Sequence, residues 1–225
     1  AAGGIFADRT RQIVTAGNQR TDRLGNRQYE SHIDRPGIKT EIIMDAKKLF
    51  EKYYQPGTPI HDLVWQHSSL VARKAMQIAD ECPDLHIDRD FVYEAALLHD
   101  IGVFLTDAPS ICCTGSEPYI RHGILGAELL RNEGYPLHAR VCERHTGSGI
   151  TREEIIAQGL PLPPQDLLPE SLEEKLVCYA DKFFSKSHPD REKKIEKIKK
   201  GLAAYGDDSI KRFEELEQLF LPKRF

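Results

Sequence analysis

The adjacent residues His99 and Asp100 carry the clearest chemical signal in this chain of 225 residues. An imidazole and a neighbouring carboxylate can bind one metal ion, and the carboxylate can also bridge to a second ion. The pair follows an apolar run of mostly small residues at 93–98, which indicates burial. Because a buried carboxylate is costly unless it is paired or coordinates a cation, this position favours a metal ligand.

Four further residues occur in similar apolar settings, namely His67, His122, His145 and Asp181. Successive candidates lie 23 to 36 residues apart, which is the length of one helix plus a connection. A single histidine on an apolar helix face is usually a core residue, but six candidates in comparable settings favour a shared centre. The spacing therefore predicts a metal site inside a helix bundle. Among the other histidines, His61 is expected to cap a helix at the surface, and His138 is a weaker candidate.

The elements that would position these residues are helical almost throughout. A first helix begins near Met44, and the apolar periodicity predicts further helices at about 60–82, 88–102, 118–133, 136–145, 152–158, 171–186, 189–203 and 207–220. Asp88 is a predicted helix cap, Gly102 suits a C-terminal cap, and Ser171 with Glu174 forms a capping-box pattern. No convincing strand is present, and the loop at 106–117 is long enough to be functional. The predicted fold class is all-α.

The chain divides by composition into three segments. We expect a metal-binding domain at 44–188 and charged helices at 189–225 that pack on the same domain. Residues 1–43 lack sustained apolar periodicity, and Met44 is the first methionine. The functional domain is therefore expected to start near Met44, after an artificial or mis-assigned extension. A flexible natural tail is the alternative, and neither would carry chemistry.

Composition excludes several kinds of partner. The hydrophobic content is 40%, the charged content is 29% and the net charge is −4, without a basic stripe interleaved with aromatic residues. We therefore expect no nucleic-acid partner. No apolar stretch approaches the roughly 18 to 20 residues that span a bilayer, so no membrane partner is expected. Five cysteines without a CxxC pair predict reduced thiols and a cytoplasmic location.

In these ligand-type residues the chain resembles the HD superfamily of metal-dependent phosphohydrolases, and specifically its HDIG subgroup. The superfamily pattern is a histidine, a later His-Asp doublet and a distant aspartate, and the subgroup adds two histidines before that aspartate. The matching segments are Trp65-Gln66-His67-Ser68, His99-Asp100, Arg121-His122-Gly123, Glu143-Arg144-His145-Thr146-Gly147 and Tyr179-Ala180-Asp181-Lys182. The resemblance covers about 44–186 and implies an HD-domain helical bundle.

The resemblance also implies two metal ions. The first would be held by His67, His99, Asp100 and Asp181, and the second by Asp100, His122 and His145, which makes Asp100 the bridge. A set of imidazoles and carboxylates suits iron, manganese, zinc or nickel better than magnesium or calcium. Glu94, Glu143 and the backbone are weak candidates for orienting the imidazoles.

The chemistry implied by the family is attack of a metal-bound hydroxide on phosphorus. Asp100 would bridge the ions, while Lys182 and Arg144 are candidates to clamp the substrate phosphate. Many HDIG proteins have a lysine three positions after the doublet aspartate, but this chain has Val103. That departure disfavours a cyclic dinucleotide substrate and leaves Asp107 as a candidate acid for the leaving group.

The segment Thr146-Gly147-Ser148-Gly149 resembles the His-Thr-x-Gly segment of HD-type dinucleoside polyphosphate hydrolases, although a plain helix terminator explains it equally well. The leading expectation is a phosphohydrolase acting on a nucleotide or another small phosphoester. The first alternative is an HD-type di-iron oxygenase with the same six ligands. The second is a non-catalytic module that binds a nucleotide and signals through the C-terminal charged helices.

Overall fold

The computed structural model describes residues 44–188 and 191–222. The expectation for residues 1–43 therefore lies outside the described residues. The fold is an all-α bundle, as predicted, and its helices are α1 (Ala46–Tyr53), α2 (Pro59–Glu81), α3 (Arg89–Leu98), α4 (His122–Asn132), α5 (Pro136–Arg144), α6 (Arg152–Ala157), α7 (Leu172–Asp181), α8 (Ile195–Leu202) and α9 (Asp207–Leu219).

Short polar side chains fix where several helices begin. The Asp45 and Thr58 side chains accept backbone N–H bonds at the starts of α1 and α2, and Asp88 does the same for α3. Ser171 and Glu174 form the predicted capping box of α7. These bonds satisfy N–H groups that have no partner inside the helix.

The loop at 106–117 contains a small strand pair that the sequence did not predict. Strand β1 (Asp107–Ala108) pairs antiparallel with β2 (Cys113–Thr114), and a short 3-10 helix at Pro109–Ile111 connects them. Two-residue strands carry no alternating pattern, which is why the sequence gives no sign of them.

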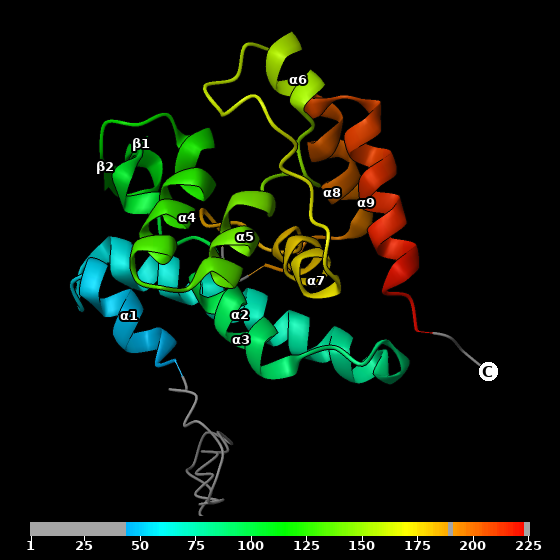
Figure 1. Cartoon of the computed structure of the whole chain (residues 1–225), viewed down its shortest axis with the longest axis horizontal. Helices are drawn as coiled ribbons and strands as arrows, with labels where there is room; N and C mark the ends of the chain where they lie inside the picture. Colours follow the sequence, from blue (N-terminus) through cyan, green and yellow to red (C-terminus); the bar gives the residue numbers. More distant parts are fainter. Residues whose placement is uncertain (1–43, 189–190, 223–225) are drawn as a thin grey trace, which may run out of the picture. The chain divides into compact units, whose positions relative to one another are not determined.

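The core lies where α2 packs on α3 and α7, while α4 packs on α5 (Figure 1). Helix α7 also contacts α3 and α5, so it lies among the helices that carry the candidate ligands. Side chains such as Val64, Val92, Leu98 and Leu176 are fully buried there.

The C-terminal helices α8 and α9 lie side by side (Figure 1). Ile198 and Leu202 of α8 and Phe213 and Leu216 of α9 are buried in the main core cluster. The Phe213 ring lies 5.4 Å from the ring of Tyr179 in α7. Helix α8 begins at Ile195, several residues later than predicted. None of the described helices is long and apolar enough to cross a membrane.

Gly102 serves close packing rather than the helix cap that the sequence predicted. Its backbone is right-handed, with φ −85°, so it needs no glycine for conformation. However, a Cβ on Gly102 would lie 2.3 Å from both Gly126 N and His122 O. Glycine therefore lets the turn that follows α3 approach α4 closely, next to His122.

Candidate metal centre

The predicted ligands converge from α2, α3, α4, α5 and α7 on the carboxylate of Asp100. On one side, Asp100 Oδ2 lies 3.2 Å from His67 Nε2 and 3.1 Å from His99 Nε2. Asp181 Oδ1 lies 3.0 Å from the same His67 nitrogen and 3.5 Å from that of His99. The four residues thus bring their ligand atoms together on the Oδ2 side of Asp100.

The other oxygen of Asp100 faces the remaining two histidines. Asp100 Oδ1 lies 3.5 Å from His122 Nε2 and 3.6 Å from His145 Nε2. The two histidine nitrogens are 3.0 Å apart. Two atoms bound to one ion at about 2.0–2.2 Å are separated by roughly 3 Å, so both groups have the spacing of a shared ion.

His99 and Asp100 lie in the turn that follows α3, and both side chains reach the centre. After Leu98 the chain turns with i→i+3 bonds, from Ile101 N to Leu98 O and from Val103 N to Asp100 O. The Tyr54 hydroxyl braces this turn, lying 3.3 Å from Asp100 O and 3.1 Å from Ile101 O.

Backbone carbonyls orient three of the four imidazoles. The Nδ1 atoms of His99, His122 and His145 each lie 2.7 Å from the carbonyl three residues earlier. This leaves Nε2 directed at the centre, as in metal-ligating histidines whose other nitrogen is hydrogen-bonded. Of the weaker sequence candidates, Glu143 pairs instead with Arg131 and Glu94 lies beside His138.

The centre holds buried polar atoms that lack partners, which is the observation that fits a metal. His99 Nε2 and Asp100 Oδ1 are buried without a hydrogen-bond partner, whereas Asp100 Oδ2 is contacted by the Lys186 ammonium. Two groups of ligand-type side chains are close enough to hold an ion, His67 with His99 and Asp181, and His99 with Asp100 and His145. Such atoms are stable in the interior only if a cation completes them.

Charge coupling at the centre is strong. Burial alone would raise the pKa of Asp100, but His99 and Lys186 hold it well below its usual range. Burial opposes the charge on His99, yet Asp100 and Asp181 raise its pKa to about 9. Burial lowers the pKa of His122 to about 3, which keeps its imidazole neutral, as metal binding requires.

Lys186 is the residue at this site that sequence reasoning missed. Its ammonium lies 2.5 Å from Asp100 Oδ2 and 5.8 Å from the centre of the Tyr119 ring. The sequence predicts helix through residue 186, but α7 ends at Asp181. The chain then folds back with i→i+3 bonds, including Phe184 N to Asp181 O, and this brings Lys186 to the centre.

The candidate catalytic residues separate into two groups. The Lys182 ammonium lies 2.6 Å from Asp181 Oδ2 and donates to His145 O at 3.0 Å, so it is part of the centre. Arg144 instead binds Glu170 Oε1 at 2.8 Å and the Leu168 carbonyl at 2.9 Å. Asp107 is exposed on β1. Neither Arg144 nor Asp107 lines the cavity over the centre.

The other two histidines of interest lie outside the centre. His61 is buried rather than at the surface, contrary to the expectation, and its ring lies 5.5 Å from that of Phe50. His138 is buried beside Phe91 and Tyr135, where burial lowers its pKa to about 4.

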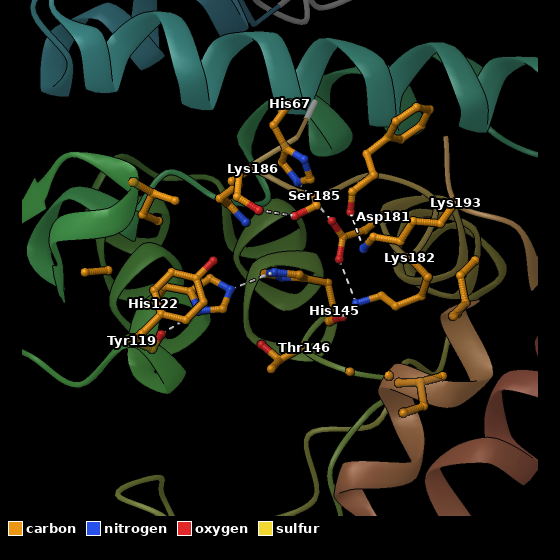
Figure 2. A pocket seen from close by; sticks show the side chains of 18 of the residues that line it. His67, Tyr119, His122, His145, Thr146, Asp181, Lys182, Ser185, Lys186 and Lys193 are labelled. Carbon is orange, nitrogen blue, oxygen red and sulfur yellow. Dashed lines mark hydrogen bonds and ion pairs between the residues drawn. The ribbon is translucent and has the colours of Figure 1, made fainter. Parts of the chain in front are cut away.

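A cavity of about 600 Å³ opens over the centre, within the size range of sites for small molecules. His67, His122, His145 and Asp181 reach its wall. Figure 2 shows Lys182 and Lys193 beside Asp181, with Tyr119 and His122 on the opposite side of the centre. Thr146 and Gly147 of the segment Thr146-Gly147-Ser148-Gly149 also line it, whereas Ser148 Oγ donates a hydrogen bond to Ser209 O at 2.7 Å.

Several relatives share part of this sequence. The chain is 37% identical over 153 residues to an uncharacterized protein of Methanocaldococcus jannaschii, covering 66% of this chain and 82% of that protein. It is 42% identical over 125 residues to a tRNA (cytidine(56)-2'-O)-methyltransferase of Picrophilus torridus, covering 55% of this chain and 32% of that protein. The enzyme of the same name from Thermoplasma volcanium is 31% identical over 188 residues, covering 81% of this chain and 48% of that enzyme. The chain thus spans about a third and about half of these two methyltransferases.

Among solved structures, the HD domain of the Listeria monocytogenes phosphodiesterase PgpH covers 78% of this chain and 97% of its own, with 15% identity and a TM-score of 0.44. The HD domain family itself matches residues 64–185, which is more than half of the chain and includes all six predicted ligands. This protein therefore belongs to the HD domain family.

Proposed function

We propose that this protein is a metal-dependent phosphohydrolase that acts on a nucleotide or another small phosphoester through two metal ions. The observation that carries the proposal is that the two carboxylate oxygens of Asp100 face different groups of ligand-type side chains. Its Oδ2 lies within 3.2 Å of His67 Nε2, and its Oδ1 lies 3.5 Å from His122 Nε2. A single buried carboxylate between two groups of ligand-type side chains is suited to bridge two ions.

In this proposal His67, His99, Asp100 and Asp181 hold one ion, and Asp100, His122 and His145 hold the other. Nitrogen-rich ligand sets favour transition metals such as iron, manganese, zinc or nickel. Two such ions, when bound, would lower the pKa of a shared water and neutralise charge on the phosphoryl group.

The lysines at the centre have separate roles in the proposal. Lys182 binds both the Asp181 carboxylate and the His145 carbonyl, so it positions one ligand from each ion. Lys186 is close to Asp100 and on the cavity wall, where its ammonium would hold an oxygen of the transferred phosphoryl group. Phosphoryl transfer depends mainly on such positioning and charge neutralisation.

The test is turnover by the protein loaded separately with each of the four metals. The panel contains nucleoside mono-, di- and triphosphates, a dinucleoside polyphosphate, p-nitrophenyl phosphate and an RNA oligonucleotide, since two relatives are named for tRNA. We expect hydrolysis, followed as released phosphate and by separation of the nucleotide products, that is lost in Asp100→Asn and kept in His138→Gln, a matched control in a buried histidine outside the centre. Absence of hydrolysis with every metal and substrate contradicts the proposal.

Two other outcomes identify the alternatives. Oxygen uptake by the iron-loaded protein, without phosphate release, would identify a di-iron oxygenase. Tight nucleotide binding without turnover or oxygen uptake would identify a non-catalytic binding module. Both assays use the same metal-loaded preparation, so the three functions are distinguished in one experiment.

A further inference from the structure

The cavity wall carries an excess of positive charge. Four of its residues are lysines, namely Lys182, Lys186, Lys193 and Lys197. The only carboxylate-bearing residue among the described lining residues is Asp181, which is already paired with Lys182 and His67. Three of the lysines lie beyond residue 185, where the HD family match ends. Two of these three, Lys193 and Lys197, lie in the segment that leads into α8 and in α8 itself.

Helical spacing brings one side of α8 to the cavity. Lys197 and Gly201 are four residues apart, so they lie one above the other on the same face. Ile198 and Leu202 on the adjoining face are buried in the core, which fixes the rotation of the helix. Lys197 thus lies on the cavity wall as a consequence of how α8 packs.

The segment before α8 is anchored to the residues that follow Asp181. Lys193 donates its backbone N–H to Phe183 O at 2.7 Å, and its Nζ donates to Phe184 O at 2.8 Å. The Lys193 ammonium is therefore held on the same side of the centre as Asp181 (Figure 2). No carboxylate pairs with Lys193 or Lys197 among the described residues.

The lysines are close enough to repel one another. Burial lowers the pKa of Lys193, the charge of Asp181 opposes this shift, and the positive charges of Lys182, Lys186 and Lys197 lower the pKa further. Ions at the centre would add still more positive charge. A multiply charged anion in the cavity would relieve this repulsion.

We propose that Lys193 and Lys197 form a second anion subsite that holds the outer phosphate of a substrate with a chain of at least two phosphates. This inference rests on the proposed function for the position of the reacting phosphate, beside Asp100. The cavity of about 600 Å³ is far larger than a single phosphate requires. The subsite gives α8 a role in selecting the substrate, whereas the six predicted ligands would perform the chemistry.

The test measures anion binding by calorimetry on the full, metal-free chain at fixed ionic strength, with orthophosphate and tripolyphosphate as probes. We expect wild type to bind tripolyphosphate at least about tenfold more tightly than orthophosphate. Lys197→Gln should weaken tripolyphosphate binding about fivefold to tenfold and change orthophosphate binding less than about twofold.

Lys200→Gln is the matched control, because Lys200 is an exposed residue of the same helix that does not line the cavity. It removes the same charge and should change tripolyphosphate binding less than about twofold. Equal losses in Lys197→Gln and Lys200→Gln would show a general charge effect and overturn the subsite. Lack of preference for tripolyphosphate in wild type would overturn it as well.

A kinetic measurement separates this inference from the proposed function. In the metal-loaded protein, Lys197→Gln should raise KM for a nucleoside triphosphate several-fold and leave the kinetics of p-nitrophenyl phosphate unchanged. If phosphate release is absent altogether, the hydrolase proposal fails while the binding result still decides the subsite. If p-nitrophenyl phosphate and the triphosphate are affected equally, the subsite is wrong although the hydrolase proposal stands.

Discussion

His122 Nε2 and His145 Nε2 face each other at 3.0 Å in the interior of the protein. Each ring has its Nδ1 placed 2.7 Å from a backbone carbonyl, so Nδ1 carries the proton in both neutral imidazoles. The two Nε2 lone pairs then point at each other without a hydrogen between them. This repulsive arrangement becomes favourable when a cation lies between the two nitrogens, which is the physical reason for assigning the second ion here.

Metal content should follow the two ligand groups. Asp100→Ala is expected to bind neither ion, because Asp100 faces both groups. His122→Ala should lose only the second ion and retain one per chain. Elemental analysis after gel filtration measures the metal content of both variants. His138→Gln is the control and should keep two ions per chain. Two ions per chain in Asp100→Ala would contradict the bridge.

Loss of the charge at Arg144 should lower mainly the stability of the protein, whereas loss of the charge at Lys182 should lower mainly its turnover. Arg144 binds Glu170 and a backbone carbonyl away from the cavity, so Arg144→Gln should cost about 1–2 kcal/mol of stability. Its turnover per folded molecule should stay within about twofold of wild type. Lys182→Gln should lower turnover by about tenfold to a hundredfold, because it contacts a ligand of each ion. Urea unfolding and steady-state kinetics measure the two effects, and a large turnover defect in Arg144→Gln would contradict the assignment.

Gly102→Ala should destabilise the protein strongly. The new Cβ would lie 2.3 Å from Gly126 N and from His122 O, both of which are backbone atoms that cannot move aside cheaply. The expected loss is about 3 kcal/mol, with weaker binding of the second ion because His122 shifts. Thermal unfolding and metal titration test this, and an unchanged midpoint would show that the turn after α3 does not need this close approach to α4.

Gly201→Ala should stabilise the protein instead. Gly201 is in α8, and a Cβ there would meet nothing within 4 Å. Alanine is favoured over glycine in a helix by about 1 kcal/mol, mainly because glycine loses more backbone freedom on folding. A higher urea midpoint is expected, and a lower one would indicate that this face of α8 is covered.

His138 should make stability sensitive to acid. Its pKa is about 4 in the folded protein because the ring is buried, whereas the ordinary value is 6.5. As pH falls below 6.5 the unfolded chain binds the proton first, so this residue lowers stability progressively down to about pH 4. The slope contributed by one group is at most about 1.4 kcal/mol per pH unit.

Unfolding in urea between pH 7.5 and pH 5 compares wild type with His138→Gln, which cannot titrate. The variant should lose less stability over this range than wild type does. Parallel pH profiles would show that the ring takes up its proton without unfolding.

The six candidate ligands and the helices that carry them could be predicted from the sequence because both depend on local information. Apolar periodicity predicts helices, and the polar residue types on their apolar faces indicate which residues are buried. Arg144 shows the limit of this reasoning, since its place next to His145 in the chain says nothing about its direction. In the fold it pairs with Glu170, 26 positions further along the sequence.

Lys186, Lys193 and Lys197 could be located only from the tertiary structure. Had α7 continued to residue 186, Lys186 would lie about 140° around the helix from Asp181. Instead the chain turns after Asp181 and returns, and α8 then packs over the cavity through Ile198 and Leu202. Sequence thus determined which residues are candidate metal ligands, because residue type and helix periodicity are local properties. Tertiary packing alone decided which charges face the cavity, because that depends on where helices end and which distant faces bury each other.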